Sequence, residues 1–449
     1  MTAGPAASGF GGFIADARRA GQLVVQPRMG MSDPRAMRAG LLATRRAAAL
    51  TVGTITLDSY TRIGDDARAK AAVAAGVELN GYPITSYDAA TTRGVLDGVA
   101  GPGFPVQIRH GSPCPERIFG ALIDAGLDAT EGGPVSYCLP YSRMPLTDSV
   151  RNWARSCELL AGLRQAGAEP HLETFGGCML GQLCPPSLLI AMSVLECLFF
   201  RQHGLRSVSL SYAQQTSHEQ DIEAIGALRR LAAEWLPDVD WHIVIYAYMG
   251  VYPRSPAGAN GLLSEAARLA TKTGAARLIV KTIAEAYWIP SIADNVEALE
   301  MAAMAAAGER RAPASRPGAD TGLYAEARRL IEAVVDLHPD LDRALLAAFR
   351  AGYLDVPYCL HPDNACRTRS YIDGDGRLQW SRIGSMPLHD LVRPSRSADA
   401  ELTAAELLIS LSFVERRFDY AHLEADLADQ IRTAPPPDRG SQSAKERCR

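Results

Sequence analysis

Short runs of β-branched and other apolar residues alternate with longer amphipathic stretches along most of the chain. The short runs predict strands at Leu23–Gln26, Leu50–Leu57, Val106–Arg109, Pro170–Thr174, Val208–Tyr212, His242–Ala247 and Leu278–Lys281. The amphipathic stretches predict helices at Cys114–Ala125, Val150–Ala166, Ser187–Gly204, Asp221–Trp235 and Leu262–Thr273. This alternation is typical of parallel βα units whose sheet is covered by helices on both faces.

The strand ends favour a closed barrel over an open sheet. Several predicted strands finish in a polar residue followed by turn residues, as at Gln26–Gly30, Arg109–Gly111 and Lys281–Thr282. A barrel builds its active site from the carboxyl ends of many strands, whereas an open sheet gathers it at one switch point. Residues 78–84 and 128–135 are ambiguous, so the sequence predicts seven to nine strands.

The fold class is therefore α/β, with a (β/α)8 TIM-type barrel followed by a C-terminal α+β appendage. We expect the barrel at residues 1–307 and a linker or surface excursion at 308–322, where Arg, Pro, Ala and Gly are concentrated. The appendage, at 323–433, combines predicted helices at 323–351 and 403–427 with a β-rich segment at 371–380. Residues 434–449 are expected to be a disordered tail.

Composition and charge describe a globular protein. Of its 449 residues, 47% are hydrophobic and 21% are charged, and the net charge is −4, which argues against nucleic acid or an anionic membrane as the main partner. The longest apolar run, Leu188–Phe200, is too short to span a membrane and contains Glu196, so it predicts a buried helix. Nine scattered cysteines without a secretion signal predict reduced thiols and a cytoplasmic location.

Three arginines, Arg28, Arg62 and Arg109, lie at predicted strand ends beside turn residues. A guanidinium group binds a carboxylate through two parallel hydrogen bonds, so three converging arginines suit a ligand with two carboxylates. The alternative is three unrelated surface arginines, because the chain contains 46 Lys and Arg residues. Their shared position at strand ends favours the binding site.

The segment from Glu131 to Tyr141 carries a second candidate group. Glu131 could accept hydrogen bonds from an ammonium group or act as a base, and Tyr137 and Tyr141 could donate hydroxyl hydrogen bonds. The alternative is a tight turn with a solvated glutamate and two packing tyrosines. Together with the arginines, Glu131 would complement an amino dicarboxylate, which carries two negative charges and one positive charge.

A third candidate is Lys281, which ends a predicted strand and precedes Glu285 by one helical turn. Lys281 could form a Schiff base with an oxo-diacid in a barrel lyase or aldolase, or could hydrogen-bond a ligand ribose or phosphate. It could also simply form an ion pair with Glu285. No metal site is predicted, because the spacing of Cys359, His361 and Cys366 matches no standard zinc pattern.

Separate blocks of sequence, in a consistent order, resemble the large (epsilon) subunit of glutamate mutase, also called methylaspartate mutase. The blocks are Gln26–Gly30, Asp58–Arg62, Leu79–Pro83, Arg109–Pro113, Glu131–Tyr141, Pro185–Ser187, Met249–Pro253, Ile279–Thr282 and Glu285–Ala286. They extend over about residues 20–395. A match of this many blocks is far more specific than any one of them.

The resemblance implies an adenosylcobalamin-dependent isomerase that interconverts L-glutamate and 3-methylaspartate by a radical mechanism. By position, the family's substrate contacts fall on Arg28, Arg62, Arg109, His110, Glu131, Tyr137 and Tyr141. Glu131 would be the catalytic carboxylate that holds the substrate ammonium. The family's cofactor contacts fall on Gly30, Asn80, Pro140, Tyr252, Lys281, Glu285 and Ile289.

The resemblance also implies a partner. The cobalt ligand of this family comes from a His in an Asp-x-His-x-x-Gly motif, and here Asp336 and His338 are followed by Leu341 instead of the required glycine. A separate small cobalamin-binding subunit would then supply the ligand, and this chain would form a homodimer within a heterotetramer. No nucleic-acid or membrane partner is implied.

The chain departs from the family at several positions. Tyr252 stands where the family commonly has Phe, and Met29 and Val251 replace smaller residues. The 175–184 loop and the 359–369 segment are divergent, and the chain begins closer to the first strand than is usual. The divergent 175–184 loop supports one further alternative, a pseudoenzyme that only binds a dicarboxylate. Sequence does not choose between glutamate catabolism and secondary metabolism, nor between glutamate and a close analogue.

Overall fold

A computed structural model describes residues 9–179, 183–309, 320–393 and 403–420. Its centre is a sheet of eight parallel strands in the order β1-β8-β7-β6-β5-β4-β3-β2. A parallel bridge between Val25 and Thr51 joins the two ends of this order, so the sheet curls into a nearly closed barrel. The strands are β1 Val24–Gln26, β2 Gly53–Thr56, β3 Val106–Arg109, β4 Ala129–Gly132, β5 His171–Thr174, β6 Ser207–Ala213, β7 Asp240–Tyr246 and β8 Arg277–Ile279.

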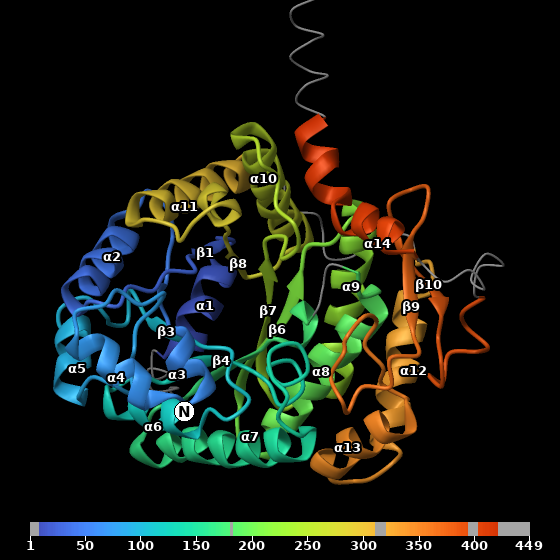
Figure 1. Cartoon of the computed structure of the whole chain (residues 1–449), viewed down its shortest axis with the longest axis horizontal. Coiled ribbons are helices and arrows are strands. Elements are labelled where there is room, and N and C mark those ends of the chain that lie inside the picture. Colours follow the sequence, from blue (N-terminus) through green and yellow to red (C-terminus); the bar gives the residue numbers. More distant parts are fainter. Residues whose placement is uncertain (1–8, 180–182, 310–319, 394–402, 421–449) are drawn as a thin grey trace, which may run out of the picture.

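Helices surround the barrel, as Figure 1 shows looking along its axis. They begin where the sequence supplies capping groups: Asp33 and Ser255 accept backbone hydrogen bonds at the start of α2 and α10, and each is followed by Pro at the first helical position. The helices are α1 Phe10–Arg19, α2 Pro34–Arg46, α3 Ser59–Ile63, α4 Asp66–Ala74, α5 Ala89–Leu96, α6 Glu116–Asp124, α7 Leu146–Ala161, α8 Pro186–Gln202, α9 His218–Trp235, α10 Pro256–Thr273 and α11 Ile292–Ala307.

The predicted barrel is confirmed, and both ambiguous segments are resolved. Residues 129–132 form β4, whereas residues 78–84 contribute only one bridge, between Leu57 and Tyr82. Most barrel strands are buried along their whole length, because helices cover the outside and side chains fill the inside.

The apolar run Leu188–Phe200 lies inside α8, and every residue from Pro186 to Phe200 is buried. This confirms the expected buried helix. One side of α8 packs on β6, and the other is covered by α12, Leu323–Val335. Among the described residues, no helix is both long and apolar enough to cross a membrane.

The C-terminal part adds α13 (Leu341–Ala351), the antiparallel pair β9 (Arg369–Ile372) and β10 (Leu378–Arg382), and α14 (Ala404–Leu411). The helix predicted over 323–351 is therefore two helices, broken after Asp336. The side chains of α12 and α13 join the same hydrophobic core as the barrel. The division at 308–322 and the expected tail at 434–449 fall largely or wholly outside the described residues, so these boundaries stay a proposal.

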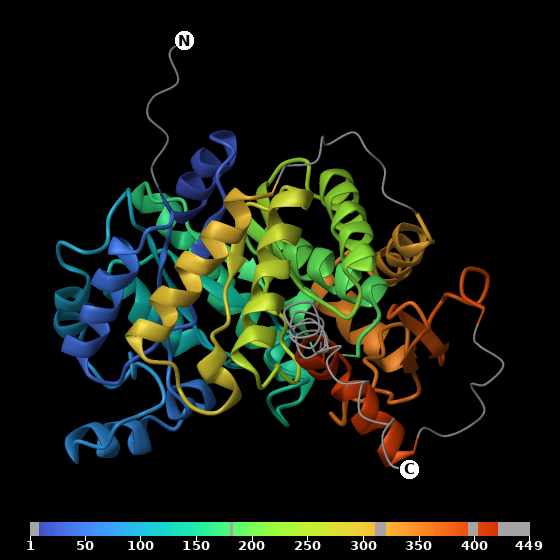
Figure 2. The ribbon, with the colours of Figure 1, turned by 90° about the horizontal axis from the view of Figure 1, so that it is seen from above.

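The two ends of the barrel differ in what covers them. Figure 2 places α1 at one end and α3 and α4 at the other, where the carboxyl ends of the strands lie. At the first end, Phe10 of α1 stacks on His171 at a centroid distance of 5.2 Å and lies under the Arg277 guanidinium. The candidate site lies at the end opposite α1, where the carboxyl ends of the strands meet.

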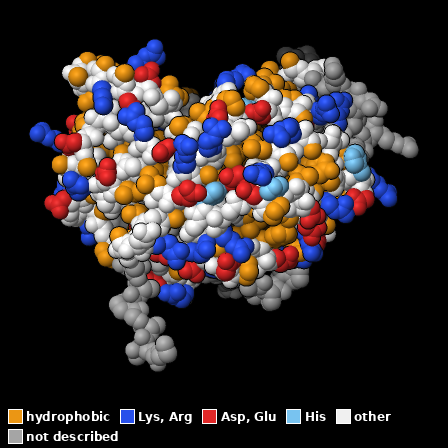
Figure 3. Space-filling view, turned by 90° about the horizontal axis from the view of Figure 1, so that it is seen from below, with side chains coloured by type: hydrophobic (Ala, Val, Ile, Leu, Met, Phe, Trp, Pro, Cys, Tyr) orange, Lys and Arg blue, Asp and Glu red, His pale blue; other side chains and the backbone are white. Residues whose placement is uncertain are grey.

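On the face that Figure 3 shows, charges of both signs are interspersed, in keeping with the small net charge.

Candidate active site at the carboxyl ends of the strands

The centre of the site is a buried ion pair between Arg109, at the end of β3, and Glu131, in β4. The Arg109 Nη2 lies 2.9 Å from the Glu131 Oε2, and both side chains are at most 5% exposed. Burial opposes ionisation of Glu131, but Arg109 and two tyrosine hydroxyls outweigh it and hold the pKa of this carboxyl below its usual value. Both groups are therefore charged at neutral pH.

Two tyrosines complete the surroundings of Glu131. The Tyr137 hydroxyl donates to Oε1, and the Tyr246 hydroxyl, at the end of β7, donates to Oε2 at 2.7 Å. Tyr137 was expected near Glu131, but nothing in the sequence singled out Tyr246. Its only signal was its place at the carboxyl end of a strand.

The turn after β4 is fixed from outside the barrel by Glu196 of α8. Its carboxylate accepts hydrogen bonds from the backbone N–H groups of Val135 and Ser136 and from the Thr174 hydroxyl, at 3.2, 2.9 and 2.6 Å. Gly133 leaves the space for this carboxylate, because a Cβ there would lie 2.1 Å from it. This buried anchor aims Tyr137 and Tyr141 across the barrel mouth.

His110 extends the site beside Arg109. Burial lowers its pKa to about 4, so the imidazole is neutral at pH 7. Its Nδ1 accepts the backbone N–H of Ser112 at 3.0 Å, which leaves the ring hydrogen on Nε2. That hydrogen faces the backbone of Glu131. Among the described residues, the buried Nε and Nη1 of Arg109 have no hydrogen-bond partner. These two buried donors are thus free for a ligand.

The three predicted arginines have different partners. Arg28 donates to Glu285 at 3.0 Å, whereas Arg62 donates to the Ser59 hydroxyl at 3.3 Å. Among the described residues, Arg62 has no carboxylate within ion-pair distance. The Tyr141 hydroxyl lies close enough to Arg28, Arg109 and Glu131 for their charges to affect its pKa. These residues therefore lie near one another at the barrel mouth.

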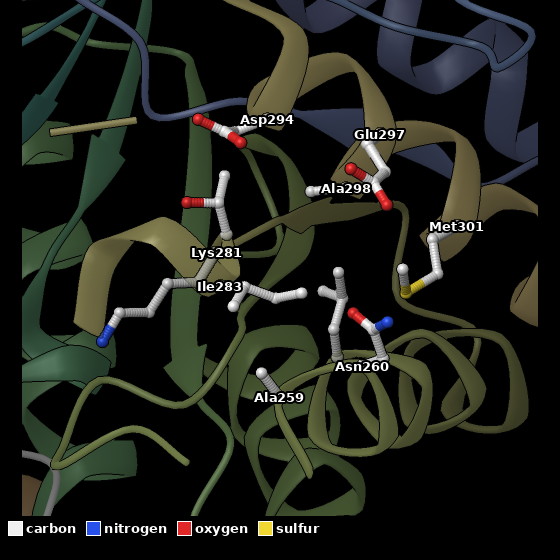
Figure 4. A pocket seen from close by; sticks show the side chains of 10 residues that line it. Ala259, Asn260, Lys281, Ile283, Asp294, Glu297, Ala298 and Met301 are labelled. Carbon is white, nitrogen blue, oxygen red and sulfur yellow. The ribbon is translucent and has the colours of Figure 1, made fainter. Parts of the chain in front are cut away.

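Three of the residues expected to contact the cofactor, Tyr252, Lys281 and Glu285, lie on the β8 side of the mouth. The Lys281 Nζ lies 4.5 Å from the centroid of the Tyr252 ring, and burial lowers the pKa of this lysine to about 8. Figure 4 shows the Lys281 side chain leading away from a small cavity of about 30 Å³ that Asn260, Glu297 and Met301 line. The amine therefore lies against the Tyr252 ring and not in that cavity.

Other expected cofactor contacts form the rim. Ile289 is 61% exposed, and Asn80 holds the start of α3 by accepting the Ser59 N–H at 2.9 Å. Gly30 packs so closely against β2 that a Cβ would lie 2.1 Å from the Thr56 carbonyl oxygen. Pro140 borders a cavity of about 440 Å³ between the segments 139–143 and 358–361. The 359–369 segment, which is divergent in sequence, thus adjoins the site.

Below the site, the barrel interior is polar, which the sequence reading missed. Arg277 of β8 pairs with Glu173 of β5, and both are fully buried. The terminal nitrogens of Arg277 also reach acceptors on Gln26, Gln107, Ser209 and His242. The available signals were Glu173 within the predicted strand Pro170–Thr174 and Arg277 directly before the predicted strand Leu278–Lys281.

Comparison with known proteins assigns the chain to a family. Residues 5–406 match the family model for the methylaspartate mutase E chain. The chain belongs to this family. Its relatives include glutamate mutase epsilon subunits from Halobacterium salinarum, 31% identical over 77% of this chain and 75% of the relative, and from Escherichia coli O157:H7, 29% identical over 74% and 72%.

A third glutamate mutase epsilon subunit, from Yersinia enterocolitica, is 27% identical over 79% of this chain and 78% of its own. The methylaspartate mutase E-chain family provides the catalytic subunit of the B12-dependent isomerase of glutamate and methylaspartate, EC 5.4.99.1. Among solved structures, a putative phosphonomutase from Burkholderia cenocepacia covers 60% of this chain and 90% of its own at 14% identity, with a TM-score of 0.33. A score this low adds no argument about the fold.

Proposed function

We propose that this chain is the catalytic large subunit of a mutase that interconverts L-glutamate and 3-methylaspartate with adenosylcobalamin. The observation that carries the proposal is the buried Arg109–Glu131 pair with free donors beside it. Burying polar donors without partners costs free energy, so such groups are typical of a site that a ligand completes. Glu131 pairs with Arg109 and shares the barrel mouth with Arg28, after β1, and with Arg62, in α3. One carboxylate and three cations complement both charges of an amino dicarboxylate.

The roles of the residues follow from these contacts. One unpartnered N–H group of Arg109, on Nε or on Nη1, would bind one substrate carboxylate beside His110, and Arg62 would bind the other. Glu131 would hold the ammonium group and share its hydrogens. Arg28, paired with Glu285, would link the substrate to the cofactor side. Held in this way, two fragments of a split carbon skeleton would recombine without diffusing apart.

The residues on the β8 side fit a cofactor that carries a ribose. Glu285 offers carboxylate oxygens, Lys281 a cation, and the buried Tyr252 hydroxyl has no partner among the described residues. Bound adenosylcobalamin supplies the organic radical that starts the rearrangement. Lys281 and Glu285 would bind the adenosine hydroxyls, while the buried walls around Tyr137 and Tyr246 exclude water from the reacting atoms.

The cobalt ligand would come from a second protein with an Asp-x-His-x-x-Gly motif, because the sequence of this chain has no such motif. The relatives are named epsilon subunits, which supports a multisubunit enzyme. We also propose a homodimer of this chain within a heterotetramer, and a cytoplasmic location.

An anaerobic assay tests the proposal. The chain, co-expressed with a small cobalamin-binding subunit, is incubated with adenosylcobalamin and L-glutamate, and 3-methylaspartate is read by NMR. We expect product that requires both proteins. Docking of the two proteins without product from any amino diacid would instead support the pseudoenzyme that only binds a dicarboxylate.

One observation favours a lyase as second candidate: the pKa of Lys281, lowered to about 8, suits a Schiff-base amine. Borohydride trapping of an oxo-diacid on Lys281 would support the lyase. Activity retained by Lys281→Arg would contradict it, because a guanidinium cannot form the imine.

A further inference from the structure

The Tyr246 hydroxyl lies between two carboxylates. It is 2.7 Å from the Glu131 Oε2, and it also contacts the Glu173 Oε1 deeper in the barrel. A phenol carries one hydrogen, so the hydroxyl can donate fully to only one of the two carboxylates at a time. All three side chains are buried, so no bulk water replaces the missing hydrogen bond.

Each carboxylate has its own guanidinium. Glu131 pairs with Arg109 at 2.9 Å, and Glu173 pairs with Arg277 and accepts the Ser209 hydroxyl at 3.1 Å. Each glutamate thus has a buried cation beside it that compensates a carboxylate charge. Burial raises the pKa of the Tyr246 hydroxyl well above its usual value, so its single hydrogen stays on the phenol.

Tyr246 differs from the other donors to Glu131. Among the described residues, neither Arg109 nor Tyr137 has a second carboxylate within hydrogen-bond distance. Of these three donors, only Tyr246 can leave Glu131 and still donate to another carboxylate, that of Glu173. A ligand ammonium that reaches Glu131 brings hydrogens and a positive charge, so it replaces the hydrogen bond that Tyr246 gives up.

We propose that Tyr246 is a positioning residue whose hydroxyl donates to Glu131 in the empty site and to Glu173 when a ligand ammonium binds Glu131. The change is a rotation about the C–O bond of the phenol, and no proton is transferred. It keeps the buried Glu131 hydrogen-bonded in both states. A diacid without an ammonium group cannot replace Tyr246, so the exchange favours amino diacids. This inference rests on the proposed function and deepens it.

Two ligands separate this role from a structural one. The chain is assembled with its small subunit and cyanocobalamin, which prevents turnover, and the dissociation constants of L-glutamate and glutarate are measured by calorimetry. Glutarate has both carboxylates but no ammonium. Glu173→Gln removes the second carboxylate, so glutamate can bind Glu131 only by breaking the Tyr246–Glu131 hydrogen bond without replacing it. We expect the preference for glutamate over glutarate to fall about tenfold in this variant, the value of one hydrogen bond to a charged group.

A matched control is Tyr212→Phe, which removes another buried hydroxyl from a carboxylate, Asp221 at 2.9 Å, outside the site. Its preference for glutamate should equal that of the wild type. In Tyr246→Phe the preference should also stay at the wild-type value, because the hydroxyl makes one hydrogen bond both before and after glutamate binds. In Tyr246→Phe/Glu173→Gln no hydroxyl has to leave Glu131, so the preference should return to the wild-type value. If Glu173→Gln does not fold, a rise in Tyr246→Phe still overturns the exchange.

An unchanged preference in Glu173→Gln overturns the exchange and assigns Tyr246 a structural role. A rise of about tenfold in Tyr246→Phe also overturns it, because the hydroxyl would then leave Glu131 without reaching Glu173. A wild-type complex that converts glutamate while Glu173→Gln keeps the same preference refutes only this inference. A wild-type complex that binds neither diacid refutes the proposed substrate class, and the inference with it.

Discussion

Arg277 and Arg109 are both buried in the barrel and both pair with a glutamate, yet their surroundings differ. Arg277, in the lower interior, distributes its terminal nitrogens over several side-chain acceptors. Arg109, one layer higher, has only Glu131, and its Nε and Nη1 have no partner among the described residues. The same kind of ion pair thus serves structure in the lower interior and ligand binding at the barrel mouth. Burial and charge do not distinguish the two arginines. Among the described residues, Arg277 has one nitrogen without a partner, Nε, whereas Arg109 has two, one of them a terminal nitrogen.

The largest expected effect is on stability, from Arg277→Met. The substitution leaves Glu173 as a buried charge without its cation, so the free energy of unfolding should fall by about 3–5 kcal/mol. Denaturant unfolding of the isolated chain measures it. The double variant Arg277→Met/Glu173→Met should recover most of the loss. If the single variant is as stable as wild type, Arg277 is not structural and the contrast with Arg109 fails.

Arg109→Lys should affect activity instead. Lysine keeps the charge opposite Glu131 but not the two unpartnered N–H groups, so kcat/KM for glutamate should fall about 100-fold, the value of one or two charge-assisted hydrogen bonds. The unfolding midpoint should change little. A large loss of stability with normal kcat/KM would reverse the roles of the two arginines.

The pH dependence separates the two sides of the mouth. Because the pKa of Lys281 is lowered to about 8, its cation is lost above that pH, and cofactor affinity should fall by up to about tenfold per pH unit until that loss is complete. Folding favours the neutral amine of Lys281. This residue therefore makes the protein more stable as the pH rises from about 8 toward the ordinary pKa that the lysine has in the unfolded chain. Cofactor titrations from pH 7 to 10 test this. Lys281→Arg should remove the decline; a decline that persists belongs to another group.

The smallest effect is expected for Tyr252→Phe. The buried Tyr252 hydroxyl has no partner among the described residues, so its removal should change the free energy of unfolding by no more than about 1 kcal/mol, in the stabilising direction. Thermal unfolding without the cofactor measures this. A weaker affinity for the cofactor in the same variant would show that the hydroxyl binds it. Unchanged affinity would make the tyrosine a neutral replacement for the family's phenylalanine.

The sequence predicted the fold in most of its parts. The barrel, the buried helix α8 and a β-rich segment at 371–380 were expected from periodicity and from the lengths of the apolar runs, and that segment forms the antiparallel pair β9 and β10. The break between α12 and α13 falls at Pro339 and at Asp340, which caps α13, so the sequence carries a signal for it within the helical stretch 323–351. Residues 78–84 resembled a strand, but they form only one bridge.

The sequence by itself determined which residue types stand at the strand ends, since Arg109 and Lys281 each close a predicted strand and Glu131 lies in the ambiguous segment 128–135. Only the tertiary structure decided which of them meet. Closure of the barrel brings Tyr246 of β7 against Glu131 of β4 and Arg277 of β8 against Glu173 of β5, pairs about 100 residues apart. Such contacts depend on strand register and tilt around the closed sheet, and local sequence patterns carry no information about either.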